Sequence, residues 1–281
     1  MFQIHFHDQE EANDLIRNLS KVMSSSIFVQ GNNIVQNYHS VIIQYPTEAQ
    51  DEVLLLLTDS LKQFIQRRKK DEWLDLLLEQ QYYYQDPEER QQILYILHSI
   101  IDGEKDDLKT FELPNDEDEI LETTIREFLL EQSTFFFESF ETFRLKPYLE
   151  HLMSYLDLAI DEYKMEQEYQ AFVSMLRDFL KGRKAKYEKV FLLDQDGFQF
   201  FSEEGIHLKR QDLTKLIDRK LLTNHPLYVD SVTIAPLISI APKQVNIYTD
   251  APDQGMVITL KNIFEEKVNV YKLEQCPFHF V

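Results

Sequence analysis

The side chain best suited to recognition chemistry is Arg144, which lies in an aromatic stretch. The local sequence is Phe140-Glu141-Thr142-Phe143-Arg144-Leu145-Lys146-Pro147-Tyr148. A guanidinium among aromatic side chains can stack on a ring or pair with a carboxylate, here Glu138 or Glu141. We expect this structural role for Arg144. Recognition of an anion or a partner protein is the alternative.

Two pairs of residues could contribute to a metal site. His5 and His7 share one face of an expected strand, opposite Phe2, Ile4 and Phe6. Two histidines at this spacing can hold a metal only if a third ligand approaches. Cys276 and His279 supply two possible ligands of a four-ligand site. We interpret the histidines as exposed strand residues and the cysteine pair as part of an ordinary C-terminal tail, so no metal and no cofactor are predicted.

A group of carboxylates could hold a metal between helices. Its members are Glu141, Asp157, Asp161, Glu162, Glu166 and Glu168. No Glu-x-x-His pair accompanies them, so we interpret them as a solvated helix face with Lys164 and Arg177 interleaved. The dinucleotide, phosphate-loop, zinc-protease and serine-hydrolase signatures are absent as well. No catalytic residue is predicted, which favours a non-enzymatic protein and leaves the enzyme question open.

The charge of the chain restricts its partners. The 281 residues carry a net charge of −20, and residues 47–133 alone hold 23 acidic and 9 basic side chains. This balance disfavours binding to nucleic acid or to anionic lipid, both of which need clustered basic residues. The basic clusters at 67–70 and 181–189 are expected to offset nearby acidic surface or to lie at helix C-termini.

Cysteine use and hydropathy predict the compartment. The chain has one cysteine, Cys276, which suits a reducing cytosol. Its first residues lack the basic and apolar regions of a signal peptide. The longest apolar runs, such as 53–57, are far shorter than the roughly 20 residues of a membrane-spanning helix. We therefore expect a soluble cytoplasmic protein without a membrane partner.

Hydrophobic periodicity predicts the elements of the first half. A strand at 2–6 and a helix at 9–23 capped by Asp8 precede a hairpin. We place its turn at Gly31-Asn32-Asn33, between strands 26–30 and 34–45. Helices then follow at 48–66, continuing past 73, at 87–101 and at 120–129. We expect a solvated loop at 102–119, and an acidic docking site for a basic partner is the alternative.

The aromatic stretch and the C-terminal part complete the pattern. Phe136, Phe140 and Phe143 form an expected helical stripe, followed by a long helix at 148–181. Further on, the elements predicted are a hairpin at 190–193 and 198–201, a helix at 209–222, a strand at 245–248, a helix at 254–264 and a strand at 268–271. Residues 231–238 fit a helix or a buried strand.

These elements predict an α+β fold in three parts. Residues 1–46 form a small β-α-β-β unit, 47–185 a helical region with a long aromatic-rich helix, and 186–281 a C-terminal α/β region. The scarcity of glycine, six in all, favours helix over a glycine-turned β fold.

Several segments resemble the YtxC-like family. They are 140–148, 161–169, Phe172 with 176–180, 237–243 and 260–264. The resemblance covers essentially the whole chain. It implies a setting among sporulation proteins of endospore-forming Bacillota, and it implies no biochemical activity. Some family members carry extra cysteines near the C-terminus where this chain has only Cys276, so no shared metal site is inferred.

The sequence therefore favours a non-enzymatic cytoplasmic protein that acts through an unknown protein partner during sporulation. The alternative is a ligand-binding protein or an enzyme with a polar site on the helical core, and nucleic-acid binding ranks third. The oligomeric state stays open. The candidate partner- or ligand-binding residues are Arg144, Tyr148, Glu168 and Tyr169.

Overall fold

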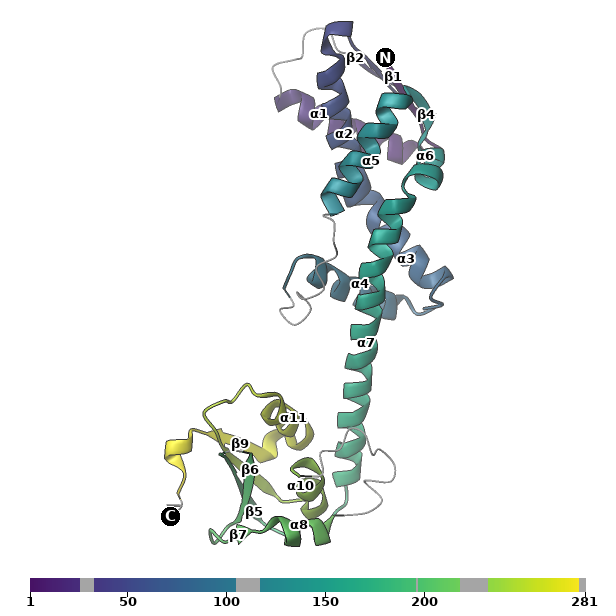
Figure 1. Cartoon of the computed structure of the whole chain (residues 1–281). Helices are drawn as coiled ribbons and strands as arrows, with labels where there is room; N and C mark the ends of the chain where they lie inside the picture. The colour runs from purple at the N-terminus through teal and green to yellow at the C-terminus, as the bar shows by residue number, and fades with distance from the viewer. Residues whose placement is uncertain (26–32, 105–116, 196, 218–231, 278–281) are drawn as a thin grey trace. The chain divides into compact units, whose positions relative to one another are not determined.

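The chain divides into two compact units, Met1–Lys164 and Met165–Val281, in a computed structural model. The structure describes residues 1–25, 33–104, 117–195, 197–217 and 232–277 (Figure 1). It has an α+β fold, with a helical middle and strands toward both ends, which confirms the predicted fold class. The three sequence ranges proposed as domains stay a prediction.

The sheet of the first unit has the strand order β2-β3-β1-β4. The strands are β1 (Phe2–His5), β2 (Asn33–Asn37), β3 (Ser40–Gln44) and β4 (Thr134–Phe136). Strand β1 pairs antiparallel with β3 and parallel with β4. Phe2 and Ile4 turn inward, as their alternation predicts, and Asp8 caps α1 (Gln9–Ser25) by accepting a hydrogen bond from the Glu10 N–H at 2.9 Å.

The hairpin turn lies elsewhere than predicted. The stretch 34–45 is not one strand, because Tyr38 and His39 form a two-residue turn that pairs Asn37 with Ser40. Tyr38 adopts the left-handed backbone (φ 46°) that such a turn requires and that glycine usually supplies. The polar residues around Tyr38 interrupt the apolar alternation and mark the turn. Residues 26–32, which include the other predicted strand, lie outside the described residues.

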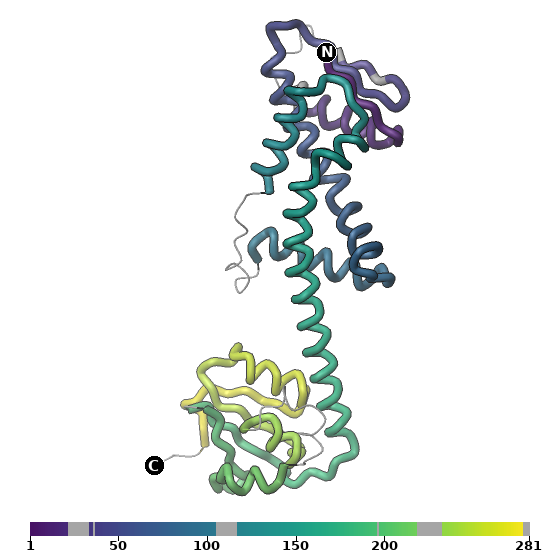
Figure 2. Tube along the Cα trace, turned by 45° about the vertical axis from the view of Figure 1, so that its right-hand side comes forward, coloured from purple at the N-terminus to yellow at the C-terminus, as the bar shows by residue number. Residues whose placement is uncertain are grey.

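Helices follow along the chain in the predicted order. They are α2 (Gln50–Phe64), the π-helical turn η2 (Ile65–Lys69), α3 (Lys70–Gln80), α4 (Pro87–Ile101) and α5 (Glu117–Glu131). Helix α2 lies beside both α1 and α5 (Figure 2). Asp86 caps α4, accepting from the Glu88 N–H at 2.9 Å, and Gly103 (φ 70°) follows its C-terminus. The predicted helices at 48–66, 87–101 and 120–129 are thus confirmed.

The predicted stripe of Phe136, Phe140 and Phe143 is wrong. Phe136 belongs to strand β4, and α6 (Phe137–Arg144) begins only after it, so the helical spacing does not include Phe136. The side chains buried here are those of Phe135, Phe137 and Phe140, whereas Phe136 is 51% and Phe143 77% exposed. Two bulky aromatic side chains are therefore left at the surface of this unit.

Helix α7 (Lys146–Leu180) is continuous, which confirms the long helix. Its residues up to Lys164 belong to the first unit, and those from Met165 belong to the second. None of the described helices combines the length and the apolar character needed to cross a membrane.

The second unit has a five-stranded sheet in the order β7-β6-β5-β8-β9. Its elements are β5 (Lys189–Asp194), β6 (Phe198–Ser202), β7 (His207–Leu208), α8 (Arg210–Leu216), α10 (Ile234–Ile240), β8 (Gln244–Tyr248), α11 (Gly255–Phe264) and β9 (Val268–Tyr271). Strands β5, β8 and β9 are mutually parallel, and β5 and β6 form the predicted hairpin. The ambiguous segment 231–238 contributes to a helix, α10, which is buried throughout.

Two consecutive lysines are buried where η2 meets α3. Lys69 and Lys70 are each 8% exposed. The Lys69 ammonium donates to Glu11 of α1 at 2.8 Å, and the Lys70 ammonium donates to Glu117 of α5 at 2.7 Å. The Tyr148 hydroxyl also donates to Glu117, at 2.9 Å. Because a buried charge is costly without a partner, these pairs fix α1, α5 and α7 around the start of α3.

Lys70→Met should lower the free energy of unfolding by about 3 kcal/mol, because it leaves the Glu117 carboxylate buried without its cation. Urea denaturation followed by circular dichroism measures the change. Adding Glu117→Gln to Lys70→Met should recover part of the loss. The control is Lys146→Met, which removes an exposed lysine and should change stability by less than about 0.5 kcal/mol. Equal stability of Lys70→Met and the control would contradict the proposed role of the pair.

Candidate functional site

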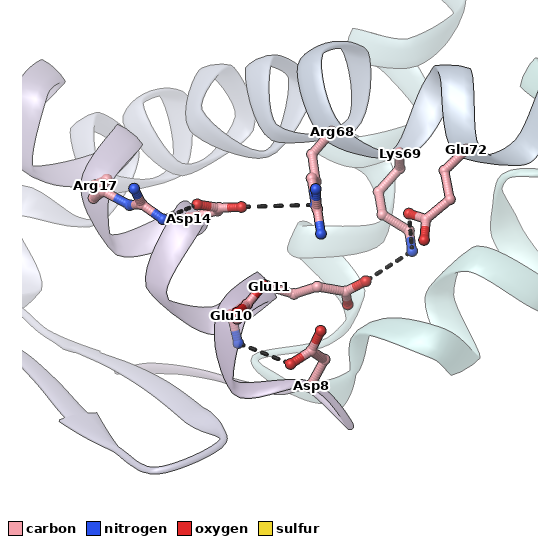
Figure 3. A network of polar contacts seen from close by, with 8 residues as sticks. All are labelled: Asp8, Glu10, Glu11, Asp14, Arg17, Arg68, Lys69 and Glu72. Atoms are coloured by element: carbon pink, nitrogen blue, oxygen red, sulfur yellow. Dashed lines mark hydrogen bonds and ion pairs between the residues drawn. The ribbon is translucent and has the colours of Figure 1, made fainter.

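A charged network surrounds Lys69, between α1 and the start of α3 (Figure 3). Glu11 of α1 and Glu72 of α3 both point at the Lys69 ammonium, at 2.8 and 3.1 Å. Burial alone would lower the pKa of Lys69, but the hydrogen bonds to these two carboxylates outweigh it, so that the pKa is raised. Asp14 of α1 pairs with Arg17 of the same helix and lies 3.8 Å from Arg68 of η2.

A cavity of about 710 Å³ lies close to this network. The apolar side chains that line it belong to α3 and α7, and polar side chains complete the lining. The lining residues are Trp73, Leu76, Leu77, Gln80, Gln81, Tyr83, Glu141, Lys146, Leu149, Glu150 and Met153. Tyr83 is 78% exposed and has a left-handed backbone (φ 63°), a strained conformation that is frequent at binding sites.

Glu141 and Trp73 are the polar groups that distinguish this cavity. Burial raises the pKa of the half-buried Glu141 carboxyl, and the nearby carboxylates of Glu11 and Glu138 add to the rise. Lys69 and the Trp73 indole oppose it without reversing it. Trp73 is 6% exposed, and its indole N–H lies beside the Glu141 carboxyl without the geometry of a well-formed hydrogen bond. The cavity therefore holds a carboxyl group that is poorly stabilised when ionised, with an indole N–H beside it.

Glu138, one turn before Glu141 in α6, is partly satisfied. One of its carboxylate oxygens accepts the His7 backbone N–H at 2.6 Å. The other is buried and has no hydrogen-bond donor within the described ranges. Together with Glu11 and Glu72, these carboxylates outnumber the one lysine among them, so negative charge dominates this part of the unit.

Arg144 lies on a different surface, where Phe136 and Phe143 are exposed. We call Phe136, Phe143 and Arg144 the aromatic surface; a hollow of about 330 Å³ lies between them and Phe128, Phe135 and Phe140. The Arg144 guanidinium is 5.5 Å from the centre of the Phe128 ring, and it donates to Glu131 at 2.7 Å. The expected stacking and pairing are both present, but the carboxylate is Glu131 and not Glu138 or Glu141.

The other three candidate residues have different surroundings. Tyr148 is fully buried, and burial together with Glu117 raises the pKa of its hydroxyl. Tyr169 belongs to the second unit, where its hydroxyl accepts from the Asn262 amide at 2.8 Å. Glu168 is an exposed residue of α7 in the same unit. Arg144 and Tyr148 thus lie in one unit and Glu168 and Tyr169 in the other, and a binding role for each stays a prediction.

The residues considered as metal ligands do not form a cluster in the described part of the chain. His5 bonds with the Ser40 hydroxyl at 2.8 Å and stacks on Phe136, and His7 lies near the same ring. No group of three or more histidine, cysteine, aspartate or glutamate side chains with metal-binding geometry occurs among the described residues. Cys276 is half-buried beside the second unit's sheet, and His279 lies outside the described residues.

Sequence reasoning missed the Trp73–Glu141 cavity. Trp73 was expected only within the helix that continues past 73, and Glu141 only as a possible partner of Arg144 or a solvated carboxylate. The one available signal was that Trp73 is the single tryptophan of the chain and lies three positions after the last of four consecutive basic residues. That signal does not indicate that α6, 68 positions later, brings a carboxylate to the same place.

Glu141→Gln should stabilise the protein at neutral pH. The folded state raises the pKa of this carboxyl above its ordinary value of 4.5, so ionisation above that pH favours the unfolded chain. The stability gained by the amide should appear as pH rises through 4.5 and should vanish below it. Melting temperatures from pH 3.5 to 8 measure this difference. A variant less stable than the parent at pH 7.5 would show that the carboxylate is favoured in the folded state.

Comparison with known proteins places this architecture in a family. The model of the YtxC-like family matches residues 56–269, which include α3, α6 and α7. An uncharacterised protein of Bacillus subtilis (strain 168), YtxC, is 39% identical over 219 residues, which cover 78% of this chain and 75% of the relative. No solved structure matches the chain. The extent of the family match and the identity to this relative both show that the chain belongs to the YtxC-like family.

Proposed function

We propose that this protein is a non-enzymatic cytoplasmic factor that binds a partner protein during sporulation. The aromatic surface is the observation that carries the proposal. Phe143 is 77% and Phe136 51% exposed, and both border a hollow that has Arg144 at its edge. Phenylalanine and arginine side chains are enriched in protein interfaces, and arginine is prominent among residues that dominate binding energy.

Charge indicates the kind of partner. Residues 1–164, the first unit, hold 33 of the 49 acidic side chains and 14 of the 29 basic ones, a net charge of −19. The second unit is close to neutral. A partner with a basic surface would be attracted to the first unit at long range, while one of its apolar side chains fills the hollow beside Phe143. The sporulation setting comes from the family resemblance, and the single cysteine suits the cytoplasm.

A crosslinking experiment tests the partner. A photoreactive phenylalanine analogue in place of Phe143 should give a defined protein adduct in sporulating cells, because this side chain is 77% exposed beside the hollow. The same analogue in place of Tyr95, which is 73% exposed in the same unit, should give none. Identical adducts from both positions, or none from position 143, would contradict the assignment of the interface.

Phe143→Ser and Arg144→Ala should each reduce spore formation to the level of a strain that lacks the gene. The melting temperature of Phe143→Ser should not change, because that side chain is mostly exposed. Spore counts and thermal melting of the purified variants measure the two effects. Normal spore counts in both variants would refute the proposed interface. A lowered melting temperature of Arg144→Ala would assign that residue to the structural contact with Phe128 and Glu131 instead.

A further inference from the structure

We propose that the cavity between α3, α6 and α7 binds a small organic cation, a primary aliphatic amine. Its ammonium group pairs with Glu141, and its chain lies along Trp73, Leu77 and Leu149. The volume of about 710 Å³ and the mainly apolar lining with a few polar groups are typical of small-ligand sites. This site shares no lining residue with the aromatic surface, so it goes beyond the proposed partner binding.

The charge of the ligand follows from the ion pairs around the cavity. Lys146, on the rim, lies 3.6 Å from Glu150, and Lys69 is held by Glu11 and Glu72. Glu141 takes part in no ion pair within the described residues, although it faces the cavity and is half-buried. A cation is therefore the group that the cavity lacks, and an anion would meet the excess of carboxylates around Glu141.

Trp73 supplies a buried donor beside Glu141. Its side chain is more than nine-tenths buried, it lines the cavity, and its indole N–H lies beside the Glu141 carboxyl, which it helps to ionise without forming a well-aligned hydrogen bond. An ammonium group has no acceptor, so the ligand acts on the indole only through the Glu141 carboxylate. When an ammonium group holds Glu141 ionised, that carboxylate also becomes a better acceptor for the nearby indole.

The apolar side chains that line the cavity indicate an apolar body for the ligand. Leu76 is 47% exposed at the rim, and Leu77, Leu149 and Met153 are half-buried along the sides. An alkyl chain that covers them gains up to about fourfold in affinity for each methylene buried. Methionine adapts to different chain shapes. Because the lining is mainly apolar, the site should prefer an amine with a long alkyl chain to a polyamine without one.

The single tryptophan allows a direct test on the full-length protein. Its indole N–H gives one resonance in a ¹H–¹⁵N spectrum, and titration with octylamine at pH 7.5 should shift that resonance saturably. 1-Octanol has the same chain without the charge and should bind about tenfold more weakly. Octanoate and spermidine should not shift the resonance at the same concentrations.

Variants assign the effect to the cavity. Glu141→Gln should reduce octylamine affinity to that of 1-octanol, whereas Glu119→Gln, at an exposed glutamate of α5, should bind as the parent does. Leu76→Ser should weaken octylamine and 1-octanol alike. The proposal fails if octylamine leaves the Trp73 resonance unmoved, if octanoate binds as well, or if Glu141→Gln keeps the full affinity. Because none of these tests involves the aromatic surface, such a failure would leave the proposed partner binding untouched.

Discussion

The first unit depends on the burial of two neighbouring ammonium groups. A π-helical turn ends at Lys69, and side chains of successive residues on a helix point about 100° apart, so Lys69 and Lys70 leave the helix in different directions. Each ammonium group therefore needs its own carboxylate, and these are Glu11 from α1 and Glu117 from α5. Because an unpartnered ammonium in the interior costs several kcal/mol, the positions of both helices are set by this one point in the chain.

Helix α6 distributes its side chains among three environments. Phe137 and Phe140 enter the core, Glu141 faces the cavity, and Phe143 lies on the aromatic surface. An eight-residue helix can do this because neighbouring positions lie about a quarter turn apart. The Lys69 network near the cavity pairs Lys69 with Glu11 and Glu72, while Glu141 takes part in no ion pair within the described residues.

Periodicity in the sequence was sufficient to predict the long helices but not to predict the short strand β4. The helices from α2 to α5, the long α7 and the β5–β6 hairpin all follow from apolar spacing. Strand β4 has three residues, too few for an alternation, so Phe136 was assigned to a helix. The turn at Tyr38 lacks the glycine that usually marks one. The approach of Trp73 to Glu141 is a tertiary contact, which local pattern does not encode.

The pairing of β1 with β4 has a consequence for biosynthesis. Gln3 lies beside Thr134, and the His7 N–H bonds to Glu138, 131 positions later. The ribosome must therefore release nearly half of the chain before the first strand acquires its parallel neighbour. Contacts between such distant segments close slowly, and until then one side of β1 keeps unsatisfied backbone groups that can pair with other nascent chains. The N-terminal sheet is thus the part of the protein for which the order and speed of synthesis matter most.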